Sequence, residues 1–207
     1  GLGDVYKRQL NTFNTQLAED LYLALKAMDN EPGVRVILLK GAGKAFCAGI
    51  DVNELAGKTA MAYRAWIEHM ERPLVTISQL KKPVIAQLQG VAAANGMGLV
   101  AAADLAIAAS NAKMGLTAIN VGLNCVGPVI PVARIVGRKK ALELLLGGDL
   151  IKAPEAQALG LVNRVVPKEE LGKAALDWAA SLAQKSPIAI QIAKKAFYAS
   201  EDMDYLK

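Results

Sequence analysis

The chain has 207 residues, 53% of them hydrophobic, and a formal net charge of +5. This length and apolar content are enough for one sizeable hydrophobic core, and no apolar run is long enough for a membrane span. Two cysteines and one histidine exclude a disulfide framework and a clustered Cys/His metal site, so we expect a reduced, cytoplasmic environment and no metal.

The first half of the chain predicts a helix, a strand and a second, longer helix. The first nine residues, GLGDVYKRQ, resemble translated adapter sequence, and we expect them to be foreign to the fold. Apolar residues at helical spacing predict a helix over residues 17–28, and a β-branched run predicts a buried parallel strand over residues 34–40. A helix begins within residues 50–56, and residues 59–79 predict a longer helix that Pro73 should kink or divide.

The second half alternates strands and helices and then becomes helical. Residues 83–89 and 105–109 predict strands on either side of a helix over residues 95–103. Residues 111–131 are rich in Gly and Pro and are expected to form a loop. Further helices are expected at residues 138–146, 153–159, 168–185 and 187–198.

This order of elements indicates the fold class and the domain organisation. Strand-turn-helix units early and helices late predict an α/β core with a helical C-terminal part. We expect the core to cover residues 10–150 and the helical region to cover residues 151–207, truncated at its end.

Two segments rich in glycine and alanine each follow a buried strand and lead into a helix. They are GAGKAFCAGID at residues 41–51 and GVAAANGMGLVAAAD at residues 90–104. Backbone N–H groups at a helix start are unpaired and can point at one spot. Two such turns side by side would form an oxyanion hole, a pair of donors that stabilises negative charge on a carbonyl oxygen. This arrangement suits acyl-thioester chemistry.

Other glycine-based sites fit the sequence poorly. The phosphate loop G-x-x-x-x-G-K-[ST] would need a glycine in place of Leu38 and a hydroxyl in place of Ala45. Gly96 and Gly98 follow a strand, as in a dinucleotide fingerprint, but the third position is Ala101 and no acidic residue ends a second strand at the required distance. A nucleotide-binding module is therefore disfavoured.

The positive charge is compatible with an anionic ligand and equally with weak nonspecific attraction to nucleic acid. Its basic residues include pairs, such as Lys81 with Lys82 and Lys139 with Lys140, that lack interleaved aromatic residues. A solvated surface explains most of them, and we expect no nucleic-acid partner.

Several collinear segments resemble the enoyl-CoA hydratase/isomerase (crotonase) superfamily. They are KAFCAGID at 44–51, KPVIAQLQGVAAANG at 82–96, INVGL at 119–123, ARIVGRKKALELLLGGD at 133–149 and A-x-x-x-G-L-V-N-R-V-V-P at 156–167. The resemblance implies a repeated β-β-α core and an acyl-CoA substrate, with coenzyme A as part of that substrate and no other cofactor. It also implies a homotrimer or a dimer of trimers.

The resemblance further assigns site residues. The backbone N–H groups of Ile50 and Asn95 would form the oxyanion hole. Ala48 would lie where the family's loop contacts the adenine end of coenzyme A, and Gly49 and Gly96 are also assigned to coenzyme A binding.

The sequence departs from the family at the acid/base positions. Family hydratases hold and deprotonate a water with two glutamates, and this chain has Gly98 and Ala118 at those positions. The isomerase and dehalogenase branches place an acid where this chain has Asn-Cys-Val at residues 124–126. The pattern is closest to members without the glutamate pair. Two alternatives therefore stay open: a lyase, isomerase or decarboxylase with enolate-type chemistry, and a non-catalytic acyl-CoA-binding protein.

The other polar and aromatic residues near the expected site have structural interpretations. Cys125 is expected to be a small buried residue instead of a nucleophile, and His69 a surface or packing residue of the helix that walls the acyl pocket. Asn124 could orient an acyl group. The remaining residues are expected to be a turn residue, a helix-start residue and two core or pocket-wall residues: Asn120, Asp51, Tyr63 and Trp66.

Overall fold

The computed structural model describes residues 10–55 and 57–201, so the expectation for the first nine residues lies outside the described part. The first part of the chain contains α2 (Thr15–Asn30), β1 (Ile37–Lys40), the 3₁₀ turn η1 (Val52–Leu55), α3 (Ala60–Gln79), β2 (Val84–Leu88), β3 (Val91–Ala93) and α4 (Asn95–Ala102). The second part contains β4 (Leu105–Ala109), β5 (Lys113–Gly115), η2 (Thr117–Val121), α5 (Val126–Gly147), β6 (Ile151–Lys152), α6 (Ala153–Ala158), β7 (Arg164–Val166), η3 (Lys168–Glu170), α7 (Leu171–Ala183) and α8 (Pro187–Ser200).

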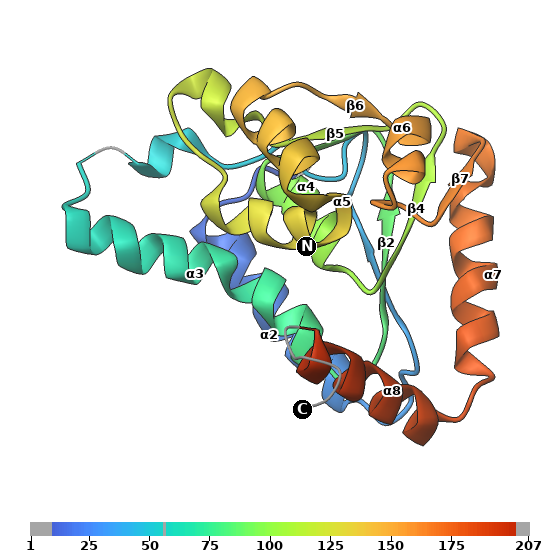
Figure 1. Cartoon of the computed structure of the whole chain (residues 1–207). Coiled ribbons are helices and arrows are strands. Elements are labelled where there is room, and N and C mark those ends of the chain that lie inside the picture. Colours follow the sequence, from blue (N-terminus) through green and yellow to red (C-terminus); the bar gives the residue numbers. More distant parts are fainter. Residues whose placement is uncertain (1–9, 56, 202–207) are drawn as a thin grey trace.

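The strands form two sheets (Figure 1). The larger sheet is parallel throughout, with strand order β1-β2-β4-β7. The smaller sheet has the order β3-β5-β6, in which β3 and β5 are parallel and β5 and β6 antiparallel. The expected α/β class with a helical C-terminal part is confirmed.

Helices cover both faces of the larger sheet, as its apolar strands require. Helix α7 contacts β1, β2 and β4, while α4 contacts β2 and β4 from the other side. The central strands read VIAQL and LAIAA and are almost entirely buried, which is typical of a parallel sheet covered on both faces. The packed core thus fixes the positions of the strand ends, and the glycine-rich segments begin at these ends.

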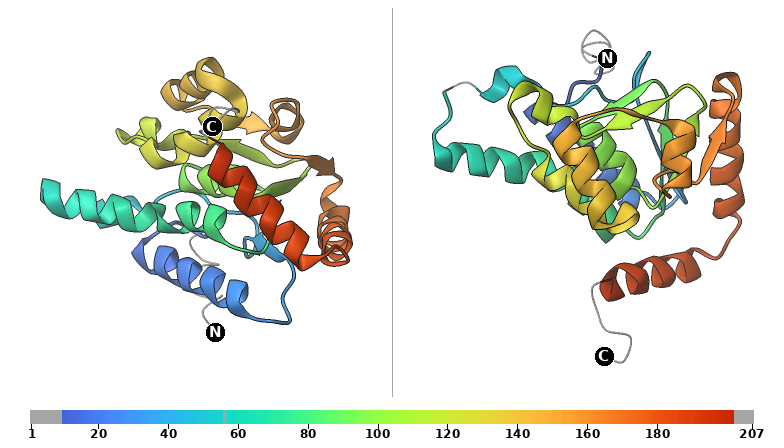
Figure 2. Two further views of the ribbon diagram at one scale, coloured as in Figure 1. Left: turned by 60° about the horizontal axis from the view of Figure 1, so that its bottom comes forward. Right: turned by 45° about the horizontal axis from the view of Figure 1, so that its top comes forward.

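Helix α8 lies against the C-terminal part of α3, apart from the other late helices (Figure 2). It is held by a buried ion pair, because Lys194 Nζ donates to Asp104 Oδ2 at 2.6 Å. Tyr198 Oη donates to the other oxygen of Asp104 at 2.8 Å. Polar contacts therefore attach this helix to the sheet.

The structure contradicts one expectation about helices and excludes one of the two outcomes expected at Pro73. Helix α5 begins at Val126 and continues through Pro131, inside the segment expected to be a loop, because its buried face packs on α4. Gly137, with φ 75°, divides α5 into two parts across a kink. Of the kink or division expected at Pro73, division does not occur, because that side chain is buried and the continuous helix α3 packs on both α2 and α4. In both cases tertiary packing outweighs the local preference of proline.

Candidate functional site

The two glycine-rich segments lie side by side. Cys47 and Ala92 form a parallel bridge, in which Ala93 N–H donates to Cys47 O at 2.9 Å. Gly96 packs onto this bridge, since a Cβ at position 96 would lie 2.5 Å from Cys47 O. A glycine there lets α4 start directly against the first segment, which brings the ends of the two segments together.

Two side-chain amides hold the first glycine-rich segment, residues 41–51, in place. The buried Asn11 Nδ2 donates to the carbonyl oxygens of Ala42, Ala45 and Phe46 at 2.9, 2.8 and 3.1 Å. Gln89 Nε2 donates to Gly41 O at 2.6 Å. These bonds satisfy carbonyl groups of a segment without regular structure and so hold its shape.

Both segments turn through a residue with a positive φ, and the second of these residues is strained. Gly49 has φ 100°, which a glycine adopts without cost. Ala94, at the start of α4, has φ 48° and ψ −114°, a conformation that is costly for a residue with a Cβ. The residues that follow are Ile50 and Asn95. Within residues 10–55 and 57–201, neither of their backbone N–H groups has a protein acceptor.

Ile50 and Asn95 line one pocket, which we call the central pocket. Its walls come from η1, α3, the start of α4, η2 and the start of α5. Most of the wall is apolar and includes Leu55, Tyr63, Trp66, Ile67, Met70 and Leu123. Asn124 adds an amide beside them. The structure thus brings the two residues assigned to the oxyanion hole together.

The residues assigned to coenzyme A binding lie behind or beside the central pocket and are not part of its lining. Ala48 is exposed, Gly49 forms the turn before Ile50, and Gly96 is buried against Cys47. Of these three residues, Ala48 alone has a side chain, and it is exposed to solvent.

The two positions that the resemblance assigns to the hydratase glutamates differ in their surroundings. Ala118 lines the central pocket. Gly98 is buried under other side chains, since a Cβ there would lie 2.8 Å from Leu74 Cδ2 and 2.9 Å from Pro128 Cβ. Position 98 therefore leaves no room for a side chain.

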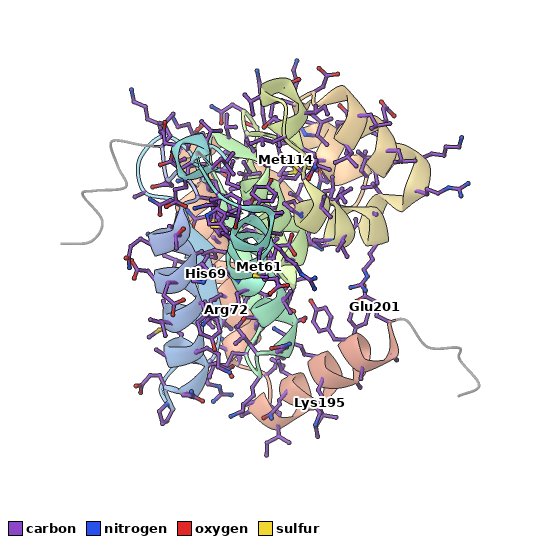
Figure 3. All side chains as sticks on the ribbon, turned by 90° about the vertical axis from the view of Figure 1, so that its left-hand side faces the viewer. Met61, His69, Arg72, Met114, Lys195 and Glu201 are labelled. Carbon is purple, nitrogen blue, oxygen red and sulfur yellow. The ribbon has the colours of Figure 1, made fainter. Side chains whose placement is uncertain are left out.

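Four other residues singled out from the sequence do not line the central pocket. His69 Nε2 is 3.1 Å from Thr15 O and faces α2, beside Arg72 (Figure 3). Cys125 is buried, and burial raises the pKa of its thiol. Asn120 Nδ2 donates to Gly148 O at 2.9 Å, while Asp51 Oδ1 accepts from the backbone of Asn53 at 3.0 Å.

Trp66 is part of the pocket wall and is held by a carboxylate. Its Nε1 donates to Glu54 Oε2 at 3.0 Å, and Thr15 donates to the same carboxylate through its backbone and hydroxyl. Partial burial acts to raise the pKa of Glu54, but these hydrogen bonds outweigh it and the pKa is lowered. Glu54 stays ionised and orients the indole.

Sequence reasoning missed Glu71, an acidic residue in the lining of the central pocket. The signal was available, because Glu71 lies at helical spacing from Tyr63, Ile67 and Leu74 on the buried face of α3. Burial and the charge of Glu68 raise the pKa of its carboxyl, and a hydrogen bond from Gly127 N–H opposes them.

Among the described residues there is no cluster of His, Cys, Asp and Glu side chains that could hold a metal ion. The described helices also include none with the length and apolar character needed to cross a bilayer.

Comparisons with known proteins point to one family. The sequence profile of the enoyl-CoA hydratase/isomerase family matches residues 6–206. A putative enoyl-CoA hydratase of Thermus thermophilus is 34% identical, covering 93% of this chain and 78% of that protein. The mitochondrial enoyl-CoA hydratase domain-containing protein 3 of Xenopus laevis is 33% identical, covering 92% of this chain and 65% of its own length.

Solved structures agree with the sequence relatives. The crystal structure of an enoyl-CoA hydratase from Mycobacterium smegmatis superposes with a TM-score of 0.91 at 34% identity, covering 95% of this chain and 77% of that one. The chain therefore belongs to the enoyl-CoA hydratase/isomerase (crotonase) family.

Proposed function

We propose that the protein is an acyl-CoA thioester enzyme in which the N–H groups of Ile50 and Asn95 polarise the thioester carbonyl. Two donors aimed at one oxygen stabilise the negative charge of an enolate, and no reorganisation is needed when that charge develops. The observation that supports this proposal is that both N–H groups lack protein acceptors in the described residues and both residues line the central pocket.

The remaining features of the proposal follow the family. The apolar wall formed by Leu55, Ile67, Met70 and Leu123 would take an acyl group. The exposed Ala48 would lie beside the adenine of coenzyme A, with Gly49 and Gly96 giving the backbone its shape. Coenzyme A is part of the substrate, and no separate cofactor is invoked. We further propose a cytoplasmic homotrimer or dimer of trimers.

Removing the backbone donors tests the proposal. Asn95→Pro deletes one N–H at the first residue of α4, a position where helices tolerate proline. Asn95→Ala is the matched control, because it removes the side chain and keeps the N–H. Loss of one oxyanion donor typically costs about 10²–10³ in rate. Turnover of a panel of enoyl-CoA thioesters should fall by this factor in Asn95→Pro and persist in Asn95→Ala.

The second donor is tested in the same way. Ile50→Pro should reduce turnover by about 10²–10³, whereas Ile50→Val, which keeps the N–H, should not. Melting temperature and acyl-CoA affinity are measured on every variant to separate folding from chemistry. A folded Ile50→Pro variant with full activity contradicts the assignment of this donor.

A second candidate function is a non-catalytic acyl-CoA-binding protein. It is favoured by Gly98 and Ala118, which carry no proton-transferring group at two positions where family hydratases have one. Calorimetric titration with an acyl-CoA, run beside the turnover assay, distinguishes the two functions. Binding without turnover of any thioester in the panel would support the binder.

A further inference from the structure

Glu71 is the one Asp or Glu among the described residues that line the central pocket. The same lining contains no His, Lys or Cys, and its other titratable side chain is Tyr63. Glu71 is therefore the side chain of this lining that can take up and release a proton near neutral pH, because the tyrosine titrates at about pH 10. It shares the pocket with Ile50 and Asn95, the residues of the proposed oxyanion hole.

The start of α5 holds this carboxylate in place. A methyl group on Gly127 would overlap the Glu71 carboxylate, so a glycine at this position is what leaves room for it. The Gly127 N–H, in the first turn of α5, donates to the carboxylate. A helix N-terminus favours a negative charge at this place. The arrangement fixes the position of a side chain that would otherwise be free to rotate.

The surroundings of Glu71 suit a group that both accepts and returns a proton. Burial is the largest cause of its raised pKa, and the charge of Glu68 adds to it. A pKa moved toward the working pH improves general acid/base catalysis. Glu71 and Gly127 also line a larger cavity of about 460 Å³. The exposed Arg134 lines the same cavity, so solvent can reach the other side of the carboxylate.

We propose that Glu71 is the catalytic acid/base of this pocket and that it shifts a proton along an enoyl thioester; this inference rests on the proposed function. The carboxylate takes the proton from C2 of a 3-enoyl thioester, and the C–H electron pair forms a dienolate whose oxygen is held by the two N–H groups. The protonated Glu71 then returns the proton to C4, which leaves a 2-enoyl thioester. No water, oxidant or reductant is consumed.

Isomerisation fits one carboxylate better than hydration does. Hydration in this family uses two glutamates on one water, whereas Gly98 is covered by Leu74 and Pro128 and offers no second acid. A 1,3-proton shift needs a single group that reaches both carbons. The site therefore favours an isomerase over a hydratase.

The test compares Glu71→Gln with Glu143→Gln as a matched control. Glu143 lies on α5, is exposed, and does not line the central pocket. Conversion of 3-hexenoyl-CoA to the conjugated 2-hexenoyl-CoA is followed by absorbance, and incorporation of solvent deuterium by mass spectrometry. Loss of a positioned acid/base typically costs about 10²–10⁴ in rate. Both rates should fall by this factor in Glu71→Gln, with unchanged thioester affinity, and Glu143→Gln should retain them.

The outcomes separate this inference from the proposed function. If the wild type isomerises the probe and Glu71→Gln does so equally fast, the role of Glu71 is wrong and the oxyanion hole stands. If the wild type binds the probe but neither converts it nor exchanges deuterium, the enolate chemistry itself is wrong and Glu71 has no reaction to catalyse. Should Glu71→Gln not fold, Glu71→Asp, which displaces the carboxylate by one methylene, must lower both rates; full activity of that variant overturns the proposal.

Discussion

At the scale of single residues, two glycines have opposite effects on the central pocket. Gly98 is a glycine because Leu74 and Pro128 occupy the space that a side chain would need. At Gly127, the carboxylate of Glu71 occupies the space that a side chain would need. The first leaves no room for an acidic side chain on α4, and the second admits an acid from a different helix.

Introducing a glutamate at position 98 should damage the protein instead of creating a hydratase. Gly98→Glu must displace Leu74 or Pro128, and overpacking of a core typically costs about 1–3 kcal/mol. We expect a lower melting temperature and crotonyl-CoA hydration as close to background as in the wild type. The control is Gly172→Glu on α7, where no atom lies within 4 Å of the added Cβ. An unchanged melting temperature with rapid hydration in Gly98→Glu would contradict the packing argument.

The raised pKa of Glu71 should make stability depend on pH. Because the folded carboxyl has a pKa above its unfolded value, the folded state binds more protons between the two values. The free energy of unfolding should therefore fall as the pH rises from the unfolded pKa, about 4.3, through the folded pKa. Glu71→Gln should remove this decrease, as measured by urea unfolding between pH 4 and pH 8.

Glu68 gives the matching control for that measurement. Its charge is the second cause of the shift after burial, so Glu68→Gln should shrink the decrease in stability without abolishing it. Identical pH profiles for wild type and Glu71→Gln would be inconsistent with a raised pKa at this residue.

At the scale of elements, α8 is attached by polar bonds more than by apolar area. Ile188, Ile192 and Phe197 on this helix are each more than 60% exposed. In contrast, Lys194 is buried, and its Nζ bonds to both Asp104 and the carbonyl oxygen of Lys82. Lys195 lies on the outer face of the same helix (Figure 3).

Breaking this ion pair should release α8. Lys194→Met leaves Asp104 without its charged partner, and removal of one partner of a buried pair typically costs about 3–5 kcal/mol. An isolated 14-residue helix is marginal in water. We therefore expect amide hydrogen exchange in α8 to accelerate by about 10² or more, while β2 and β4 stay protected. Lys195→Met should exchange like the wild type, and equal effects of both variants would contradict this account.

At the scale of the whole molecule, the fold encloses both thiols in one core. Cys47 and Cys125 are free and buried in the same hydrophobic cluster. Burial raises the pKa of the Cys47 thiol to about 11. Reactivity of both thiols therefore depends on opening of the folded core, because the thiolate is the reactive form.

Thiol labelling should follow unfolding. In the native protein at pH 8, an aromatic disulfide reagent should label neither cysteine rapidly, and both should react at once in denaturant. The melting temperature should be insensitive to reductant and to chelator, since both cysteines are free and the described residues contain no cluster that could hold a metal ion. Rapid labelling of Cys47 in the folded protein, or a melting temperature lowered by chelator, would be the contrary result.

The sequence by itself determined the parts of this protein that depend on local pattern. Apolar periodicity predicted α2, and apolar runs predicted β2 and β4 within one residue or two. The two glycine-rich segments indicated two neighbouring strand-to-helix turns, the family resemblance assigned Ile50 and Asn95 to them, and both residues line one pocket. These features are readable because spacing and strand-to-helix turns are encoded by neighbouring residues.

Only the tertiary structure decided the features that depend on distant residues. Helix α5 starts inside a segment rich in Gly and Pro because packing on α4 outweighs local propensity. The space at Gly98 is set by side chains from α3 and α5, and the position of Glu71 by the backbone of Gly127. A pattern of neighbouring residues does not specify such contacts, because their free energy arises from surfaces that the fold alone brings together.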